Sequence, residues 1–259
     1  MKRPASWLAP AWASGAVGAL MSTREGGVSS GPYASLNLGT AVGDDPDRVA
    51  DNRARFAEAC AALPVFLRQV HGTRVVRVGA GDARPGASPL EADASLTTEP
   101  GVACTVQIAD CLPVLFAAPE GQGVAAAHAG WHGLSAGVLE ATVAALCEAA
   151  HCRPEQIEAW LGACIGPRAF EVGADVLAAF GADRPGSDTN RFISLRPDKW
   201  LADLAGLARD RLAAAGVARV SGGGWCVVED ASRFFSFRRD RVTGRMAAAV
   251  WLTGDGAAR

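Results

Sequence analysis

The chain has 259 residues, of which 49% are hydrophobic and 20% charged, so it can bury a sizeable apolar core. Its formal net charge is −2 and no basic run stands out, so we expect no nucleic-acid partner. No stretch approaches the roughly 20 apolar residues of a membrane span, and prolines interrupt the basic N-terminal segment before a signal-peptide core can form. We therefore expect no membrane association, a cytoplasmic location, and a single domain over residues 1–259.

The first predicted elements are one helix and several short strands. Residues 46–62 begin with acidic residues and a proline and then space apolar residues helically, which predicts a helix. The segment RQVHGTRVVRV alternates β-branched and polar residues around His71-Gly72, which predicts two short strands joined by a turn. The Pro/Gly stretch at 83–89 predicts a surface loop between two strands.

The middle of the chain predicts strands that stop abruptly. GVACTVQIADCLPVLFAAP indicates a strand up to Ile108, a break at 109–111, and a second strand that starts near Pro113. The next segment predicts a buried strand ending at His128, a glycine-bracketed turn, and an amphipathic helix over 135–150. Such strand ends are where a rigid sheet presents polar side chains.

The last third continues the mixture of elements. The predicted strands lie at 157–166, 227–230 and 246–252, and the predicted helices at 172–180 and 199–216. Strands and helices alternate irregularly, without repeated βαβ units. We therefore expect an α/β fold of the mixed α+β kind, with mixed sheets flanked by helices.

The seven cysteines favour free thiols over a disulfide framework. Their number is odd, and they lack the regular spacing of a small secreted scaffold. Cys60 and Cys147 fall in predicted helices and Cys104 in a strand, where a free cysteine behaves as a small apolar side chain. Cys111 differs, because it follows Asp110 at the predicted strand break.

The four histidines, at positions 71, 128, 132 and 151, are the other candidate metal ligands. His151 follows an alanine-rich helix, where a polar residue near the helix C-terminus is common. His71 and His128 lie at glycine-flanked strand ends, and with Cys111 they form a set that suits catalytic zinc with one open position. The three match no compact metal motif, so their convergence is a prediction. The alternative for each histidine is an imidazole hydrogen-bonded in a turn.

Seven strings spread over nearly the whole chain together form a specific pattern. They are STREGGVSSGPYASLNLG at 22–39, QVHG at 69–72, EADASLTT at 91–98, ADCLPVL at 109–115, HAGWHG at 128–133, LGACIGPRAFEVG at 161–173 and FFSFRRDRVTGR at 234–245. In these strings the chain resembles the YfiH-type family, whose members are described as multicopper polyphenol oxidase (laccase)-like proteins and as purine nucleoside phosphorylases. The resemblance implies a YfiH-like fold.

The resemblance also implies an activity and a cofactor. It implies a zinc site at His71, Cys111 and His128, and phosphorolysis of adenosine, inosine and methylthioadenosine, with adenosine deamination as a second reaction. The partners would then be small-molecule purine nucleosides and phosphate. One departure is His132, since the family commonly has arginine there, and a protonated imidazole replaces only part of a guanidinium.

Four further residues are candidates for catalysis and substrate binding. Zinc lowers the pKa of bound water from ~15.7 towards ~7, and Asp110 could move that proton or orient a ligand. Capping of a turn is the alternative for Asp110. Arg24 and Arg238 are candidates to hold phosphate or ribose, with structural ion pairs as the alternative. Asn37 is a third candidate contact, while the glycines at 26–27 are typical of a plain turn.

Three other functions remain open from the sequence. Four histidines are too few for a multicopper laccase, although a single copper at the same site could oxidise polyphenols weakly. A cysteine hydrolase with Cys111 as nucleophile and His128 as base could act on amides or cell-wall peptides. A zinc-stabilised interaction protein would unfold when its metal is removed. For all of these we expect a monomer or a weak homo-oligomer.

Overall fold

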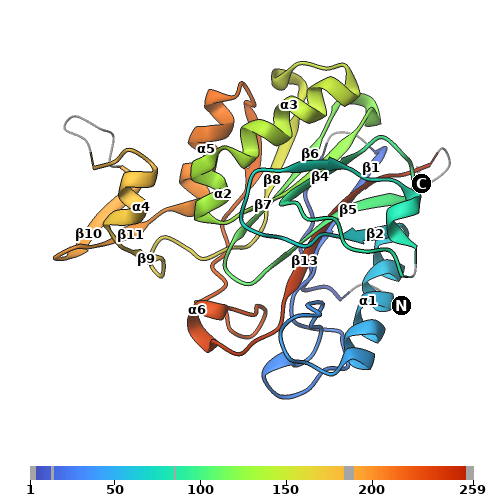
Figure 1. Ribbon diagram of the computed structural model, residues 1–259, viewed down its shortest axis with the longest axis horizontal. Coiled ribbons are helices and arrows are strands. Elements are labelled where there is room, and N and C mark those ends of the chain that lie inside the picture. Colours follow the sequence, from blue (N-terminus) through green and yellow to red (C-terminus); the bar gives the residue numbers. More distant parts are fainter. Residues whose placement is uncertain (1–3, 13–14, 85, 184–189, 255–259) are drawn as a thin grey trace.

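Two β-sheets stacked face to face form the centre of the computed structural model, which describes residues 4–12, 15–84, 86–183 and 190–254 (Figure 1). The six-stranded sheet has the order β12-β8-β6-β7-β4-β3, and the four-stranded sheet the order β1-β13-β5-β2. A small sheet of order β10-β11-β9 lies at one end of the molecule. The predicted mixed α/β architecture is confirmed.

The strands and helices have the following bounds. The six-stranded sheet contains β3 (Val75–Arg77), β4 (Ala94–Thr97), β6 (Leu112–Ala117), β7 (Val124–Ala129), β8 (Glu158–Leu161) and β12 (Arg219–Gly222). The other strands are β1 (Val17–Met21), β2 (Leu63–Phe66), β5 (Val102–Ile108), β13 (Met246–Leu252), β9 (Glu171–Val172), β10 (Phe192–Arg196) and β11 (Lys199–Ala202). The helices are α1 (Pro46–Cys60), α2 (Trp131–Ala136), α3 (Val138–Ala150), α4 (Ala174–Ala179), α5 (Leu204–Ala214) and α6 (Phe237–Asp240).

Helices cover the outer faces of both sheets, so the fold has four layers. Along β13, alternate side chains enter different layers: Val250 joins the core between the sheets, and Ala249 packs towards α1. Along β6, Leu115 faces the four-stranded sheet, whereas Phe116 joins the cluster under α3 and α5. Both faces of these strands are therefore buried, which explains their continuous apolar sequences.

Several predicted elements are shorter or divided in the structure. The helix expected over 135–150 is divided at Gly137, whose φ of 100° ends α2 before α3 begins. The strand expected over 157–166 is confined to β8, and the helix expected over 172–180 is α4. His151 is the C-cap residue of α3, which confirms its predicted place.

Other predictions are wrong because tertiary pairing overrides local pattern. The first residues of the helix expected over 199–216 form β11, which pairs with β10 and β9, and α5 starts only after the N-cap Asp203. Residues 227–230 form turns and not a strand. Of the two short strands predicted around His71-Gly72, only the second forms, as β3. Residues 67–74 before it are an irregular connection. The sequence pattern did not indicate β1, β10 or β12.

Two sequence-based expectations fall partly outside the described residues. In the loop expected at 83–89, residue 85 is not described, and residues 84 and 86–89 have no helix or strand. In the N-terminal segment, residues 1–3 and 13–14 are not described. Within the described ranges, no helix has both the length and the apolarity to cross a membrane.

Candidate metal centre

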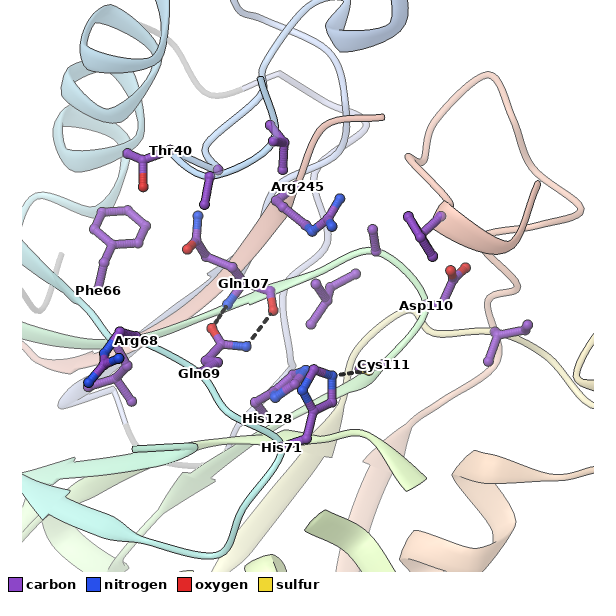
Figure 2. A pocket seen from close by; sticks show the side chains of 18 of the residues that line it. Thr40, Phe66, Arg68, Gln69, His71, Gln107, Asp110, Cys111, His128 and Arg245 are labelled. Atoms are coloured by element: carbon purple, nitrogen blue, oxygen red, sulfur yellow. Dashed lines mark hydrogen bonds between the residues drawn. The ribbon is translucent and has the colours of Figure 1, made fainter. Parts of the chain in front are cut away.

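Three chain segments bring His71, Cys111 and His128 together. His71 lies in the connection before β3, Cys111 directly precedes β6, and His128 belongs to β7, which pairs with β6. The possible ligand atoms all lie within 4.8 Å of one another, and Cys111 Sγ is 3.9 Å from His71 Nε2 (Figure 2). Tetrahedral zinc bonds of ~2.3 Å to sulfur and ~2.0 Å to nitrogen place such atoms roughly 3.5 Å apart. The predicted group therefore converges at a spacing that could hold a metal ion.

Asp93 is a buried carboxylate that orients two of these residues at once. Its Oδ1 lies 2.8 Å from His128 Nδ1, which leaves His128 Nε2 as the ligand atom. The same carboxylate accepts the backbone N–H groups of Val70, His71 and Gly72 at 3.1, 2.9 and 2.7 Å. These bonds hold the turn in which His71 has a φ of 62°, an uncommon backbone conformation for histidine.

The electrostatics of the group favour ionised Asp93 and Cys111. Burial opposes ionisation of Asp93, but hydrogen bonds from His128 and the backbone outweigh it and lower the pKa of the carboxyl. Burial likewise opposes the Cys111 thiolate, yet the neighbouring His128 and His71 lower the pKa of the thiol to about 6. Cys111 and Asp93 raise the pKa of His128, against the effect of its burial. The thiolate is the form of cysteine that binds metal.

Glycines allow helix α2 to start directly at this group. Gly130 is the N-cap of α2, and a Cβ there would lie 2.9 Å from both Cys111 Sγ and His71 Cδ2. A Cβ at Gly133 would lie 2.8 Å from the carbonyl oxygen of Gly72. The glycines of HAGWHG are therefore required by close approach, since a larger residue would displace the histidine turn or the thiol.

The group opens into a cavity of about 790 Å³ whose wall is cationic. The arginines that line it are Arg53, Arg68, Arg238, Arg241 and Arg245. Its aromatic lining consists of Phe66, Trp131, Phe170 and Phe237. Asp110 is the one carboxylate among the described lining residues, although the whole chain has a net charge of −2. Local charge of this kind favours an anionic ligand.

Asp110 lies beside Cys111, and its position is compatible with both interpretations of this residue, turn capping and catalysis. Its Oδ1 accepts the Ser236 hydroxyl at 2.6 Å, and its Oδ2 accepts the backbone N–H of Arg238 at 2.7 Å, so it caps the first turn of α6. It also lines the cavity (Figure 2). Burial raises the pKa of Asp110 despite these hydrogen bonds. Its catalytic role stays a prediction.

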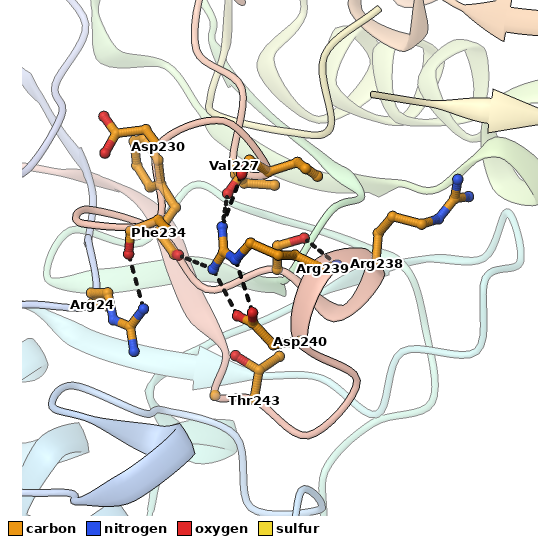
Figure 3. A network of polar contacts seen from close by, with 12 residues as sticks. Arg24, Val227, Asp230, Phe234, Arg238, Arg239, Asp240 and Thr243 are labelled. Carbon is orange, nitrogen blue, oxygen red and sulfur yellow. Dashed lines mark hydrogen bonds and ion pairs between the residues drawn. The ribbon is translucent and has the colours of Figure 1, made fainter. Parts of the chain in front are cut away.

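Arg238 lines the cavity on a loop that Arg239 stabilises. Arg239 donates to the carbonyls of Val227 and Phe234 and pairs with Asp240, which fastens the 227–240 segment (Figure 3). Arg238 itself points away from this network and donates from Nη1 to a backbone carbonyl at 2.9 Å. The two adjacent arginines of FFSFRRD therefore face different surroundings.

Arg24 does not line the cavity. Its Nε donates to the carbonyl of Ala34 at 2.8 Å and its Nη1 to that of Ala231 at 2.9 Å. Its guanidinium carbon lies 4.7 Å from the centroid of the Phe235 ring. These contacts join three segments of the chain, so the structure places Arg24 in a structural position.

Asn37 is also absent from the cavity wall, and its amide is fully engaged. Its Nδ2 donates to Gly39 O at 3.2 Å and to Asp44 Oδ2 at 2.9 Å. Its Oδ1 accepts the backbone N–H groups of Gly39 and Arg245 at 2.9 and 2.8 Å. A primary amide offers two donor hydrogens and two lone pairs. No polar group of Asn37 therefore remains for a substrate.

Sequence reasoning missed several residues around the group. Asp93 and the cavity arginines Arg53 and Arg245 were not among the candidates. Gln69 was also missed; its side-chain amide pairs with the backbone N–H and carbonyl of Gln107 at 2.7 and 2.9 Å (Figure 2). The available signal for Asp93, Gln69 and Arg245 was their presence in the strings of the family pattern.

The other two histidines, His132 and His151, and the other six cysteines lie outside the group. His132 is exposed and stacks on Trp131 with ring centroids 3.5 Å apart. All seven cysteines are free thiols, as expected. Burial raises the pKa of five of them, which are Cys60, Cys104, Cys147, Cys152 and Cys164. Cys111 is thus distinguished by its lowered pKa as well as by its place.

Comparison with known proteins gives consistent matches over most of the chain. The family model described as multi-copper polyphenol oxidoreductase laccase matches residues 18–253. A purine nucleoside phosphorylase of Pseudomonas aeruginosa is 49% identical over 248 residues, covering 95% of this chain and 98% of the relative. Purine nucleoside phosphorylase YfiH of Escherichia coli is 52% identical over 239 residues, covering 91% and 94%.

Solved structures match the fold closely. The crystal structure of a Neisseria meningitidis protein has a TM-score of 0.88 and 45% identity, and the match covers 96% of this chain and all of that one. YlmD from Geobacillus stearothermophilus has a TM-score of 0.86 and 34% identity, covering 92% and 93%. The described fold is therefore also that of these two bacterial proteins.

Proposed function

The chain belongs to the multi-copper polyphenol oxidoreductase laccase family, as its resemblance to YfiH-type proteins predicted, and we propose that it is a metal-dependent purine nucleoside phosphorylase. The proposed substrates are phosphate with adenosine, inosine or methylthioadenosine, and adenosine deamination is the proposed second activity. His71, Cys111 and His128 would hold one zinc ion. The observation that supports this function is the convergence of these three residues at a cavity lined by five arginines.

The cavity has properties suited to a nucleoside and an oxyanion. Its volume of about 790 Å³ falls within the usual range of small-molecule sites. Aromatic side chains in the wall offer surfaces for a purine base, and guanidinium groups match the planar, bidentate geometry of phosphate oxygens. When bound, the metal ion would supply Lewis-acid chemistry, including a lowered pKa of coordinated water.

We assign the proton-transfer role to Asp110. Burial raises the pKa of this carboxyl, so it can hold a proton closer to neutral pH than an exposed aspartate can. Its oxygens accept the Ser236 hydroxyl and the Arg238 backbone N–H, and a carboxylate has further lone pairs that a ligand or water can use. Asp93 would act through His128, whose ring it orients.

Product analysis by chromatography tests the proposal. Metal-analysed protein is incubated with adenosine or inosine, with and without phosphate, beside the variants His71→Ala and His132→Ala. We expect phosphate-dependent adenine and hypoxanthine from wild type and His132→Ala, and neither from His71→Ala. Deamination is measured separately, as inosine formed from adenosine in the absence of phosphate. Zinc-loaded protein that releases no base in the presence of phosphate would refute the proposal.

A cysteine hydrolase is the second candidate, because one feature of the geometry favours it. Asp93, His128 and Cys111 follow one another in the order carboxylate, imidazole and thiol, as in nucleophilic triads. His71, however, places a second imidazole 3.9 Å from Sγ, which a hydrolase does not require and a metal site does. A metal-bound thiolate resists alkylation until a chelator is added, whereas a nucleophilic thiol is alkylated at once.

Copper oxidase chemistry is a weaker candidate. Within the described ranges, His71, Cys111 and His128 are the one group found that suits a transition metal. A trinuclear copper cluster requires many more imidazoles than the two histidines that remain in the sequence. We therefore assign any oxidation of polyphenols to copper replacing zinc at the same three residues.

A further inference from the structure

Arg245 is a half-buried cation that lines the cavity, lies 5.9 Å from the centroid of the Phe237 ring and forms no ion pair with any residue that the structure describes. Its Nη1 donates to the carbonyls of Thr243 and Gly244 at 3.2 and 3.1 Å. Among the residues that the structure describes, none accepts a hydrogen bond from its Nε or Nη2, and none pairs with its charge. Burying a cation without an anionic partner costs free energy. The free side of this guanidinium therefore favours an anionic ligand.

The backbone and the stem of Arg245 are fixed by residues 37–39. Its N–H donates to Asn37 Oδ1 at 2.8 Å, and its carbonyl accepts the Leu38 N–H at 3.0 Å. A Cβ at Gly39 would lie only 2.7 Å from Arg245 Cγ, so the arginine stem packs directly on the glycine. The guanidinium is thus held in place before a ligand arrives, which lowers the entropy lost on binding.

The other cavity arginines are exposed or already engaged: Arg68 pairs with Glu91, and Arg241 is exposed to solvent. Arg53 lies 3.9 Å above the Phe66 ring, and its Nε is occupied by the Leu38 carbonyl. Arg238 is exposed and anchored at Nη1 to a backbone carbonyl. Burial lowers the pKa of Arg245, and Asp110 and Cys111 are near enough to offset part of that effect, although neither forms an ion pair with the guanidinium. Figure 2 shows it on the cavity wall with Gln107, on the side facing Asp110.

We propose that Arg245 binds the phosphate that takes part in the reaction, and that Asn37 is its positioning residue. The identity of the anion as a co-substrate rests on the proposed phosphorolysis. The assignment of the binding residue rests on the unpaired guanidinium and its fixed backbone. Because all four hydrogen-bonding positions of Asn37 are occupied, Asn37 acts on the ligand only through Arg245.

Calorimetric titration of the zinc-loaded full chain with inorganic phosphate tests the assignment without any turnover. Arg245→Gln should weaken phosphate binding at least about tenfold, and Arg245→Lys should weaken it less, because lysine keeps the charge but not the bidentate geometry. Arg219→Gln is the matched control: Arg219 is on β12, outside the cavity lining, and its loss changes the net charge equally. This control should bind phosphate as wild type does.

Three results would overturn the assignment. One is wild-type protein that binds no phosphate, and another is Arg245→Gln protein that keeps wild-type affinity. The third is binding through Arg245 of adenosine 5′-monophosphate but not of inorganic phosphate, which would make the site one for a phosphoryl group carried by the substrate. If phosphorolysis fails while phosphate binds through Arg245, the proposed function is wrong and the anion site stands. If the Arg245→Gln variant catalyses phosphorolysis with an unchanged KM for phosphate, the proposed function stands and the assignment of Arg245 is wrong.

A double-mutant cycle tests the role of Asn37. Asn37→Ala should weaken phosphate binding about fivefold or more in the wild-type background, and by less than about twofold once Arg245 is glutamine. Equal losses in both backgrounds would contradict a role through Arg245. Gly39→Ala serves as a second variant if Asn37→Ala does not fold. Its methyl group would push the arginine stem aside, and we expect it to weaken phosphate binding without removing a polar group.

Discussion

Substituting Asp93 by asparagine should weaken the metal centre and the fold together. The carboxylate accepts four hydrogen bonds, from His128 Nδ1 and three backbone N–H groups. An asparagine oxygen can replace one carboxylate oxygen, while its NH2 group faces two N–H donors and leaves them unpaired. Two lost bonds to a buried charge, at about 1.5–3 kcal/mol each, lower the free energy of unfolding by roughly 3–6 kcal/mol.

The effect on the metal follows from the same contacts. Removing a carboxylate that orients a ligating histidine typically costs ~10–100-fold in metal affinity. Competition for zinc with a chromophoric chelator measures this loss, and urea unfolding followed by circular dichroism measures the stability. Asp51→Asn, which removes an exposed carboxylate in α1, is the control and should change neither. Zinc affinity within twofold of wild type in Asp93→Asn would refute the role given to Asp93.

Three further predictions concern the same centre. Gly130→Ala should abolish stoichiometric zinc binding, because its Cβ would lie 2.9 Å from Cys111 Sγ, whereas Gly224→Ala, with open space around it, should bind zinc normally in the same metal analysis. In metal-stripped protein, the rate at which iodoacetamide alkylates Cys111 should follow an apparent pKa near 6, because the neighbouring imidazoles stabilise the thiolate. His128→Ala should raise that pKa. Mass spectrometry of the alkylated protein across a pH series measures the midpoint, and an unshifted midpoint in the variant would contradict the prediction. Asp110→Asn should lower kcat at least about tenfold while zinc content stays stoichiometric, and unchanged turnover would remove Asp110 from the reaction.

The three candidate metal ligands could be located because strand ends are visible in the sequence. Cys111 and His128 stand out because polar residues end an apolar run at each of them. His71 stands out because a glycine follows it in a predicted turn between strands. Their convergence follows from sheet pairing, since β6 and β7 are neighbours in which Pro113 opposes His128. Buried apolar runs likewise revealed β5, β6, β7 and β13, whose two faces are both covered.

The residues that position other side chains around the site could not be derived in the same way. Asp93 and Asn37 act through contacts with segments more than 20 residues away, and local pattern contains no information about such contacts. The direction of a side chain is also not visible in the sequence: Arg24 and Arg238 both lie within recognisable strings, yet only Arg238 lines the cavity. Residues 199–202 read as the start of a helix because their pairing with β9 and β10 is tertiary.

Phosphorus NMR of inosine turnover is the most direct test of metal-dependent phosphorolysis. Zinc-loaded, chelator-stripped and zinc-reconstituted protein would each be incubated with inosine and phosphate. We predict ribose 1-phosphate and hypoxanthine in equal amounts, lost after stripping and restored by one equivalent of zinc. Free ribose in place of ribose 1-phosphate, or turnover that is unaffected by removal of the metal, would contradict the proposed function.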